Sequence, residues 1–300
     1  MPEWDAEVVF DEALVRTLLA EQFPELDASS VRLLGEGWDN SVWVVEDMWA
    51  FRFPRRGIAI PGVERELVVL PRLAPLLPVP VPEPRFVGVP SELFPWPFFG
   101  AALLGGLEVA DAGLAEDARS ELGAELGRFL RVLHDIEVDV DLPDDPIRRA
   151  DTPFRVERTR ERLDTSEALG VWTPSPEVER ILAQAEQLEP SRHRVVTHGD
   201  LHLRHVLVEN GALSGVIDWG DMCRSDPAID LMLVWSPLPR SGRERFVGEY
   251  GPVDEEARLR ARVLALFLGL TLTLYGRDVG NEGLERECLA GLERTLVDWD

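Results

Sequence analysis

The stretch 198–230 places acidic and imidazole side chains on both sides of a predicted β-hairpin. The pair Asn210-Gly211 stands between two short apolar runs, and an Asn-Gly pair flanked in this way is the strongest short-range signal for a hairpin turn. Folding back at this turn brings Asp218, at the end of the second strand, alongside the loop from Asp200 to His205 that enters the first strand. The sequence therefore predicts that these three side chains converge, an arrangement that suits a metal-assisted transfer.

The order of motifs in this stretch resembles that of kinases. A kinase catalytic loop reads Asp-x-x-x-x-Asn and is followed by a hairpin and a second, metal-binding Asp. Here the loop runs from Asp200 to His205, and Asp218 follows in IDWGD, where a protein kinase has DFG. The fuller set of HGDLH, hairpin, IDWGD and SDPAID resembles the aminoglycoside phosphotransferase family of small-molecule kinases. The resemblance implies a kinase-like fold and phosphorylation of antibiotic hydroxyls, with antibiotic resistance as the outcome.

The same resemblance implies a role for each of the three side chains. Asp200 would accept a hydrogen bond from the substrate hydroxyl and take its proton, Asp218 would be the principal Mg²⁺ ligand and His205 the second. His205 stands where most members have Asn, and a His there resembles the macrolide phosphotransferase branch. A neutral imidazole is a competent metal ligand. Because Mg²⁺ prefers carboxylate oxygens, His205 would suit Mn²⁺ better.

Several neighbouring side chains have structural interpretations. His198 is expected to fix the loop by hydrogen bonds, whereas His202 and Arg204 either contact the reacting groups or face solvent. Asp221 either orients the metal-binding loop or has no role there. The two acids of SDPAID are explained as a helix N-cap and as an acceptor inside the larger lobe.

The first part of the chain predicts a helix over 7–23 and then an antiparallel meander of strands over 31–34, 42–45 and 49–53. A Gly-x-Gly turn between the first two strands is where kinases cover the nucleotide phosphates, although a Gly-x-Gly in a hairpin more often has no ligand-binding role. The resemblance assigns nucleotide contacts here to Gly35, Gly37, Asn40 and Ser41.

Arg52 occupies the place of the strand Lys with which kinases contact the α- and β-phosphates. A guanidinium can bind phosphate and a carboxylate together, so the role survives the change. Glu66, on a helix predicted over 63–70, is the expected partner of Arg52, and Glu64 is the alternative. Arg52 could instead be a solvated strand residue.

The proline-dense segment 78–97 cannot be helical and favours extended edge strands of the smaller lobe. A polyproline ligand for a partner domain is the alternative interpretation. The residues 98–106 that follow resemble the interlobe hinge of kinases, whose backbone groups, here at Ala102 and Leu104, would contact the purine ring.

Beyond this segment the pattern is helical, and the resemblance implies an α+β, bilobal protein-kinase-like fold. The N-lobe, residues 1–104, would hold a small antiparallel sheet with one helix, and the C-lobe, residues 105–300, would be larger and mainly helical. The apolar spacing predicts C-lobe helices over 115–136, 152–169, 176–188, 228–235, 254–275 and 284–299.

Composition is consistent with such an enzyme. With 300 residues, 45% of them hydrophobic, the chain can bury a core large enough for two lobes. The formal net charge of -24 argues against a nucleic-acid partner, which requires Lys and Arg surfaces. A cationic small-molecule acceptor is favoured instead, although acidic surfaces also serve solubility.

The sequence also indicates the cellular compartment. Cys223 and Cys288 form no disulfide framework and are expected as reduced thiols. The N-terminal segment has no secretory pattern, and the apolar run 263–275 is shorter than the roughly 20 residues of a membrane span. We therefore expect a cytoplasmic protein without a membrane partner, using ATP or GTP with Mg²⁺ or Mn²⁺. A metabolic hydroxyl kinase and a degenerate nucleotide-binding protein remain alternatives.

Overall fold

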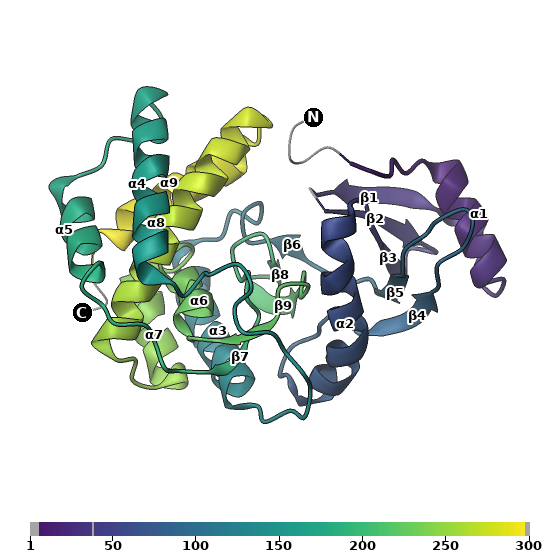
Figure 1. The fold of residues 1–300 in the computed structure, drawn as a ribbon, viewed down its shortest axis with the longest axis horizontal. Helices are drawn as coiled ribbons and strands as arrows, with labels where there is room; N and C mark the ends of the chain where they lie inside the picture. Colours follow the sequence, from purple (N-terminus) through teal and green to yellow (C-terminus); the bar gives the residue numbers. More distant parts are fainter. Residues whose placement is uncertain (1–5, 38, 298–300) are drawn as a thin grey trace. The chain divides into compact units, whose positions relative to one another are not determined.

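The computed structural model describes residues 6–37 and 39–297, and these fold into two compact units (Figure 1). Unit 1 consists of residues 1–76 and 80–104, and unit 2 of residues 77–79 and 105–300. Unit 1 contains an antiparallel sheet, whereas unit 2 is mainly helical. The predicted α+β class is therefore confirmed.

Unit 1 is built on a five-stranded antiparallel sheet with the strand order β1-β2-β3-β5-β4. The predicted meander forms its first three strands, and the proline-dense segment contributes the edge strand β4, where missing backbone N–H groups are tolerated. The strands are β1 Arg32–Glu36, β2 Asn40–Val45, β3 Trp49–Pro54, β4 Pro84–Gly88 and β5 Phe98–Ala102.

The two faces of this sheet carry different residues because side chains alternate along a strand. Phe51 and Phe53 point to one face and join an aromatic core with Phe98, whose ring stacks on that of Phe53 at 4.6 Å. Helix α1 (Glu12–Gln22) covers this face. Arg52 points to the opposite face, where Val63 of α2 (Ile60–Leu73) packs.

Two boundaries in unit 1 differ from the sequence prediction. The first helix begins at Glu12 rather than at residue 7, because Asp11 caps it by accepting a hydrogen bond from the Leu14 N–H at 2.8 Å. Residues 98–102, predicted as part of a hinge, form β5 inside the sheet, because their bulky side chains are buried on both faces. Short 3₁₀ turns over 28–30, 57–59 and 74–76 complete the unit.

Unit 2 contains the predicted helices and one, α7, that the sequence pattern did not indicate. The last helix was predicted over 284–299 but begins at Glu282 and ends at Thr295, and Trp299 lies outside the described residues. The helices are α3 Glu116–Asp135, α4 Thr152–Ala168, α5 Pro176–Ala185, α6 Ala228–Leu231 with the 3₁₀ turn η4 Met232–Trp235, α7 Arg240–Tyr250, α8 Glu255–Asp278 and α9 Glu282–Thr295.

The predicted hairpin is confirmed and belongs to a small sheet of unit 2 in the order β6-β8-β9. Asn210 and Gly211 have φ angles of 52° and 83°, the left-handed conformation that a two-residue turn of this type needs at both positions. The strands are β6 Leu107–Glu108, β8 Val206–Glu209 and β9 Ala212–Val216, and a second pair, β7 Val195–Thr197 with β10 Cys223–Ser225, holds the ends of the predicted site.

Helix α8 is the core helix of unit 2. Among the described residues it alone is long and apolar enough to cross a membrane, since it extends beyond the apolar run 263–275. Its Leu266 and Leu270 are fully buried against α4, α5 and α9. Its first half also carries the buried Arg260 and Arg262, which donate hydrogen bonds inside the unit. The helix thus serves as packing for its neighbours.

Helices α3 and α7 pack closely because glycines stand at their contact. A Cβ atom on Gly123 would lie 2.1 Å from the carbonyl oxygen of Gly242, and one on Gly127 would lie 2.6 Å from that of Phe246. Both distances are far shorter than van der Waals contact. The backbones of the two helices can therefore approach only while these positions lack a side chain.

We expect Gly123→Ala to destabilise the protein by about 1–3 kcal/mol, because the added methyl group overpacks the contact between α3 and α7. Gly248→Ala is the matched control, since Gly248 lies on the exposed side of α7 with open space around it. There the change should stabilise the helix by about 0.5–1 kcal/mol. Urea unfolding followed by circular dichroism measures both, and equal effects would contradict this account.

Candidate active site

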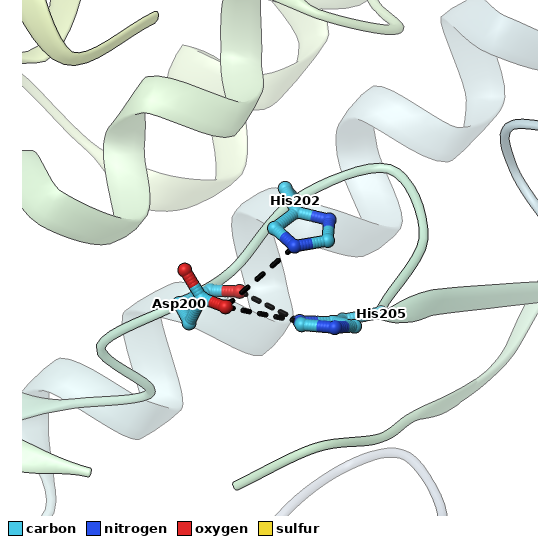
Figure 2. Close-up of side chains that lie close together, drawn as sticks. All are labelled: Asp200, His202 and His205. Carbon is cyan, nitrogen blue, oxygen red and sulfur yellow. Dashed lines mark hydrogen bonds and ion pairs between the residues drawn. The ribbon is translucent and has the colours of Figure 1, made fainter. Parts of the chain in front are cut away.

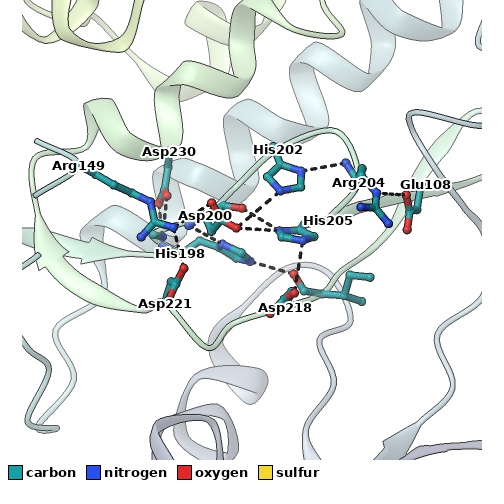
Figure 3. Close-up of polar contacts among 12 residues, drawn as sticks. Glu108, Arg149, His198, Asp200, His202, Arg204, His205, Asp218, Asp221 and Asp230 are labelled. Carbon is teal, nitrogen blue, oxygen red and sulfur yellow. Dashed lines mark hydrogen bonds and ion pairs between the residues drawn. The ribbon is translucent and has the colours of Figure 1, made fainter. Parts of the chain in front are cut away.

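The hairpin brings Asp200, His205 and Asp218 together as predicted (Figure 3). His205 immediately precedes β8 and Asp218 follows β9, and the Ile217 N–H donates to the His205 carbonyl at 2.9 Å. The His205 Nε2 atom lies 3.4 Å from Asp218 Oδ2, and its Nδ1 atom lies 3.8 Å from Asp200 Oδ2. Asp218 has a φ angle of 64°, a strained conformation for a residue with a side chain and one that is often found at functional sites.

The hydrogen bonds of His205 define its tautomer. Nδ1 lies 2.8 Å from the Asp200 carbonyl oxygen, which can only accept, so Nδ1 carries the proton. Burial lowers the pKa of His205, and the neighbouring His202 lowers it further, so the ring is neutral near pH 7. Nε2 therefore directs a lone pair at the Asp218 carboxylate. Two electron-rich atoms at this separation suit a cation held by both, and the donor set thus fits a divalent metal ion.

Three side chains of the loop, Asp200, His202 and His205, also form a compact group whose possible ligand atoms lie within 4.8 Å of one another (Figure 2). His202 is buried and its ring lies against that of His205, with 3.8 Å between centroids. Its Nδ1 accepts the Arg204 N–H at 3.2 Å, which leaves the proton on Nε2, 3.6 Å from Asp200 Oδ2. His202 therefore presents a proton to Asp200 rather than a lone pair to a metal ion.

Arg149, which no sequence motif indicated, contacts the predicted catalytic carboxylate. Its NH2 group donates to Asp200 Oδ1 at 3.0 Å and to Asp221 Oδ2 at 2.6 Å. Burial alone would raise the pKa of Asp200, but Arg149 and then His202 outweigh it and hold this pKa well below its usual value. Asp200 is accordingly ionised, with Oδ1 engaged by Arg149.

The backbone of the loop is also fixed by Asp230 and by His198. Asp230 accepts the N–H groups of His198 and Gly199 at 2.8 and 3.0 Å, so this acid is the internal acceptor that the sequence suggested. His198 donates from Nε2 to the Ile217 carbonyl at 3.0 Å and accepts the Asp200 N–H at Nδ1, which agrees with a structural role. The other acid of SDPAID, Asp226, accepts the Ala228 N–H at 2.7 Å, but the N-cap of α6 is Pro227 rather than Asp226 as predicted.

The remaining predicted residues lie in unit 1. Arg52 donates from NH1 to Glu66 Oε1 at 3.0 Å, and Glu66 is fully buried, so Glu66 rather than Glu64 is the partner. Ser41 is also fully buried, and its hydroxyl accepts the Trp43 indole N–H at 2.8 Å, so its side chain is occupied inside unit 1.

The other five predicted positions of unit 1 are described by their backbone geometry. The Gly37 N–H donates to the Asn40 carbonyl at 2.8 Å, and a Cβ atom on Gly35 would meet open space. Ala102 pairs with Trp49 at the end of β5, and Leu104 lies in the segment that follows. Their contacts with nucleotide remain predictions.

Comparison with known proteins places these motifs in a family. The model of the phosphotransferase enzyme family (APH) matches residues 30–264. The chain belongs to this family. Its predicted resemblance to aminoglycoside phosphotransferases is thereby confirmed. An aminoglycoside 3'-phosphotransferase from Escherichia coli is 36% identical over 85 residues, and the match spans 25% of this chain and 31% of that relative.

Solved structures show the same fold for this phosphotransferase-family chain. Aminoglycoside 2'-phosphotransferase-IIIa in its GDP complex has a TM-score of 0.70 at 24% identity, covering 96% of this chain and 99% of that one. Macrolide 2'-phosphotransferase from Brachybacterium faecium has a TM-score of 0.63 at 24% identity, covering 94% and 97%.

The tautomers predict which side chains of this family member bind a metal ion. We expect His205→Ala and Asp218→Asn each to weaken Mn²⁺ binding by more than about tenfold, the scale of loss seen even for outer-shell partners. His202→Ala is the control and should weaken Mn²⁺ binding less than His205→Ala does, since its protonated Nε2 offers no lone pair to the ion. Electron paramagnetic resonance titration of free Mn²⁺ measures all three. A loss for His202→Ala as large as for His205→Ala would instead favour the cluster in Figure 2.

Proposed function

We propose that this protein is a small-molecule kinase that transfers the γ-phosphate of ATP or GTP to a hydroxyl of an aminoglycoside- or macrolide-type antibiotic, or of a similar cationic molecule. The convergence of Asp200, His205 and Asp218, with a neutral imidazole lone pair facing a carboxylate, carries the proposal. Family membership and the aminoglycoside phosphotransferase relatives support it.

In the proposed reaction, Asp200 acts on the acceptor hydroxyl. Its Oδ1 is engaged by Arg149, so Oδ2 accepts the hydroxyl hydrogen bond and takes the proton as the oxygen attacks the γ-phosphorus. The bond from that phosphorus to the β,γ-bridging oxygen breaks, and the nucleoside diphosphate leaves. His205 and Asp218 would hold Mg²⁺ or Mn²⁺, which when bound neutralises charge on the phosphates.

The nucleotide side of the proposal rests on unit 1. The buried carboxylate of Glu66 orients Arg52, whose side chain is 14% exposed, and a guanidinium held in this way can donate to phosphate oxygens. Gly35 and Gly37 stand at the turn between β1 and β2, where kinases cover the nucleotide phosphates, and glycine allows the backbone to come close to a phosphate. Solved relatives bind GDP and ATP, in keeping with a nucleoside triphosphate co-substrate.

The acceptor side rests on charge and on the relatives. The net charge of -24 favours a cationic molecule over an anionic one. One structural neighbour was solved with GDP and kanamycin, and another is a macrolide 2'-phosphotransferase. We also propose that the protein works in the cytoplasm, where nucleoside triphosphates are available.

The direct test is phosphorylation of a panel of aminoglycosides and macrolides with ATP or GTP and Mg²⁺ or Mn²⁺, followed by mass spectrometry. The wild type should form a phosphorylated product, and Asp200→Asn should lower kcat by about 10²–10⁴-fold, because the hydroxyl loses its proton acceptor. If phosphorylated product forms from sugars, choline or homoserine but from none of the antibiotics, the protein is a metabolic kinase. If the wild type neither forms product nor hydrolyses nucleotide, the protein is a degenerate nucleotide-binding member.

A second prediction concerns the nucleotide. Glu66→Gln keeps the size of the side chain but removes the charge that orients Arg52, so the KM for nucleotide should rise by about tenfold with a smaller change in kcat. Glu64→Gln is the control on the same helix, because Glu64 is exposed. Steady-state kinetics over a range of nucleotide concentrations measure the difference, and equal KM values for the two variants would remove the nucleotide role of the pair.

A further inference from the structure

A loop between α3 and α4 delivers a guanidinium to the proposed active site, although it belongs to none of the sequence motifs. Its residue Arg149 is only 12% exposed at the side chain and contacts two carboxylates through a single nitrogen, NH2. We propose that Arg149 is a positioning residue that, held by Asp221, orients Asp200 for the acceptor hydroxyl. The inference rests on the proposed kinase function.

Hydrogen bonds from both sides hold the backbone of this loop in place. Asp145 accepts the backbone N–H groups of Arg149 and Ala150 at 2.8 and 2.7 Å, through one carboxylate oxygen each. The buried Arg155 donates to the carbonyl of Arg148 at 3.1 Å and to the preceding carbonyl at 2.6 Å. Asp145 and Arg148 both have positive φ angles, of 22° and 56°. Strained backbone persists only where its surroundings hold it, so the position of Arg149 is specified.

Asp221 completes this arrangement from the other side. Its carboxylate lies 2.6 Å from the Arg149 nitrogen, and its carbonyl oxygen packs against Gly199, where an added Cβ would lie 2.1 Å from it. Gly199 also has a φ angle of 90°. The backbone at Asp221 therefore packs directly against the backbone next to Asp200, so a shift of the Asp221 segment would also move Asp200.

Two consequences follow for the geometry of Asp200. First, the charge-assisted bond to Oδ1 fixes the carboxylate rotamer and leaves Oδ2 for the acceptor. Second, the guanidinium offsets the repulsion among Asp200, Asp218 and Asp221, which are gathered around the same loop. Without Arg149, the Asp200 carboxylate would lose the donor that holds Oδ1 and could turn away from the acceptor hydroxyl.

The test compares Arg149→Ala with Arg148→Ala, which changes a neighbouring arginine that is 61% exposed at the side chain and pairs with Asp151. We expect Arg149→Ala to lower kcat by about 100-fold, the effect of a small misplacement of a catalytic group. The KM for nucleotide and the affinity for Mn²⁺ should change less than about twofold, since neither site is contacted. Arg148→Ala should keep wild-type kinetics.

Added guanidinium ion at millimolar concentration distinguishes positioning from a general structural role. It should restore part of the kcat of Arg149→Ala, because it can occupy the space between the two carboxylates, and should leave Arg148→Ala unchanged. Arg149→Lys should keep an intermediate kcat, since an ammonium retains the charge without the planar fork. Failure of rescue in a folded Arg149→Ala, with a melting temperature near that of wild type, would overturn the proposal.

Asp221→Asn supplies a measurement that does not depend on the folding of Arg149→Ala, because Asp221 is 45% exposed. We expect kcat to fall by about tenfold, and the double variant with Arg149→Lys to be no slower than the slower single variant. Fully multiplicative losses would overturn the coupling. If the wild type forms no phosphorylated product, the proposed function is wrong. If the wild type is active and Arg149→Ala is equally active, only the role of Arg149 is wrong.

Discussion

The hydrogen bond from His205 Nδ1 to the carbonyl oxygen of Asp200 is the interaction on which the site depends. It closes the loop that carries both residues, and it places the imidazole proton on the nitrogen that faces away from Asp218. The lone pair of Nε2 is thereby directed at a carboxylate, and the fit to a divalent cation follows from this one proton position. The hairpin contributes to the same cation site, because it brings Asp218 next to Nε2 of the His205 ring.

The rigidity of the loop comes from buried partners outside the hairpin. Asp230 accepts two backbone N–H groups of the loop, and its Oδ2 also accepts from His134 Nε2 at 3.1 Å. The His134 Nδ1 atom in turn lies 2.8 Å from the hydroxyl of Tyr250, at the end of α7. The close contact of α3 with α7, made possible by glycines, therefore also sets the distance between these two side chains, so packing of the helices bears on the geometry of the loop.

Features specified by neighbouring residues could be predicted from the sequence, and features specified by distant contacts could not. The turn at Asn210-Gly211 needs two positive φ angles, which those residue types accept. The hairpin, and the approach of Asp218 to the loop from Asp200 to His205, could therefore be predicted. The pair of Arg52 with Glu66 was expected from the resemblance to kinases, with Glu64 as the alternative. The role of Arg149 could not be predicted, because its contact with Asp200 joins residues 51 positions apart and no sequence pattern marks the loop. Helix α7 was missed because glycine, arginine and glutamate give it little apolar periodicity.

His205 can replace the usual Asn because both side chains present one hydrogen-bond donor and one acceptor in the same arrangement. A carboxamide presents an N–H donor and a carbonyl oxygen, and an imidazole protonated at Nδ1 presents a donor and an acceptor in the same order. The loop carbonyl and the cation would thus meet equivalent groups in either case. The difference is that an amide cannot lose its acceptor by protonation, whereas an imidazole can. Burial, which lowers the pKa of His205, keeps that acceptor available near neutral pH, so the same surroundings that fix the ring also keep it able to bind a cation.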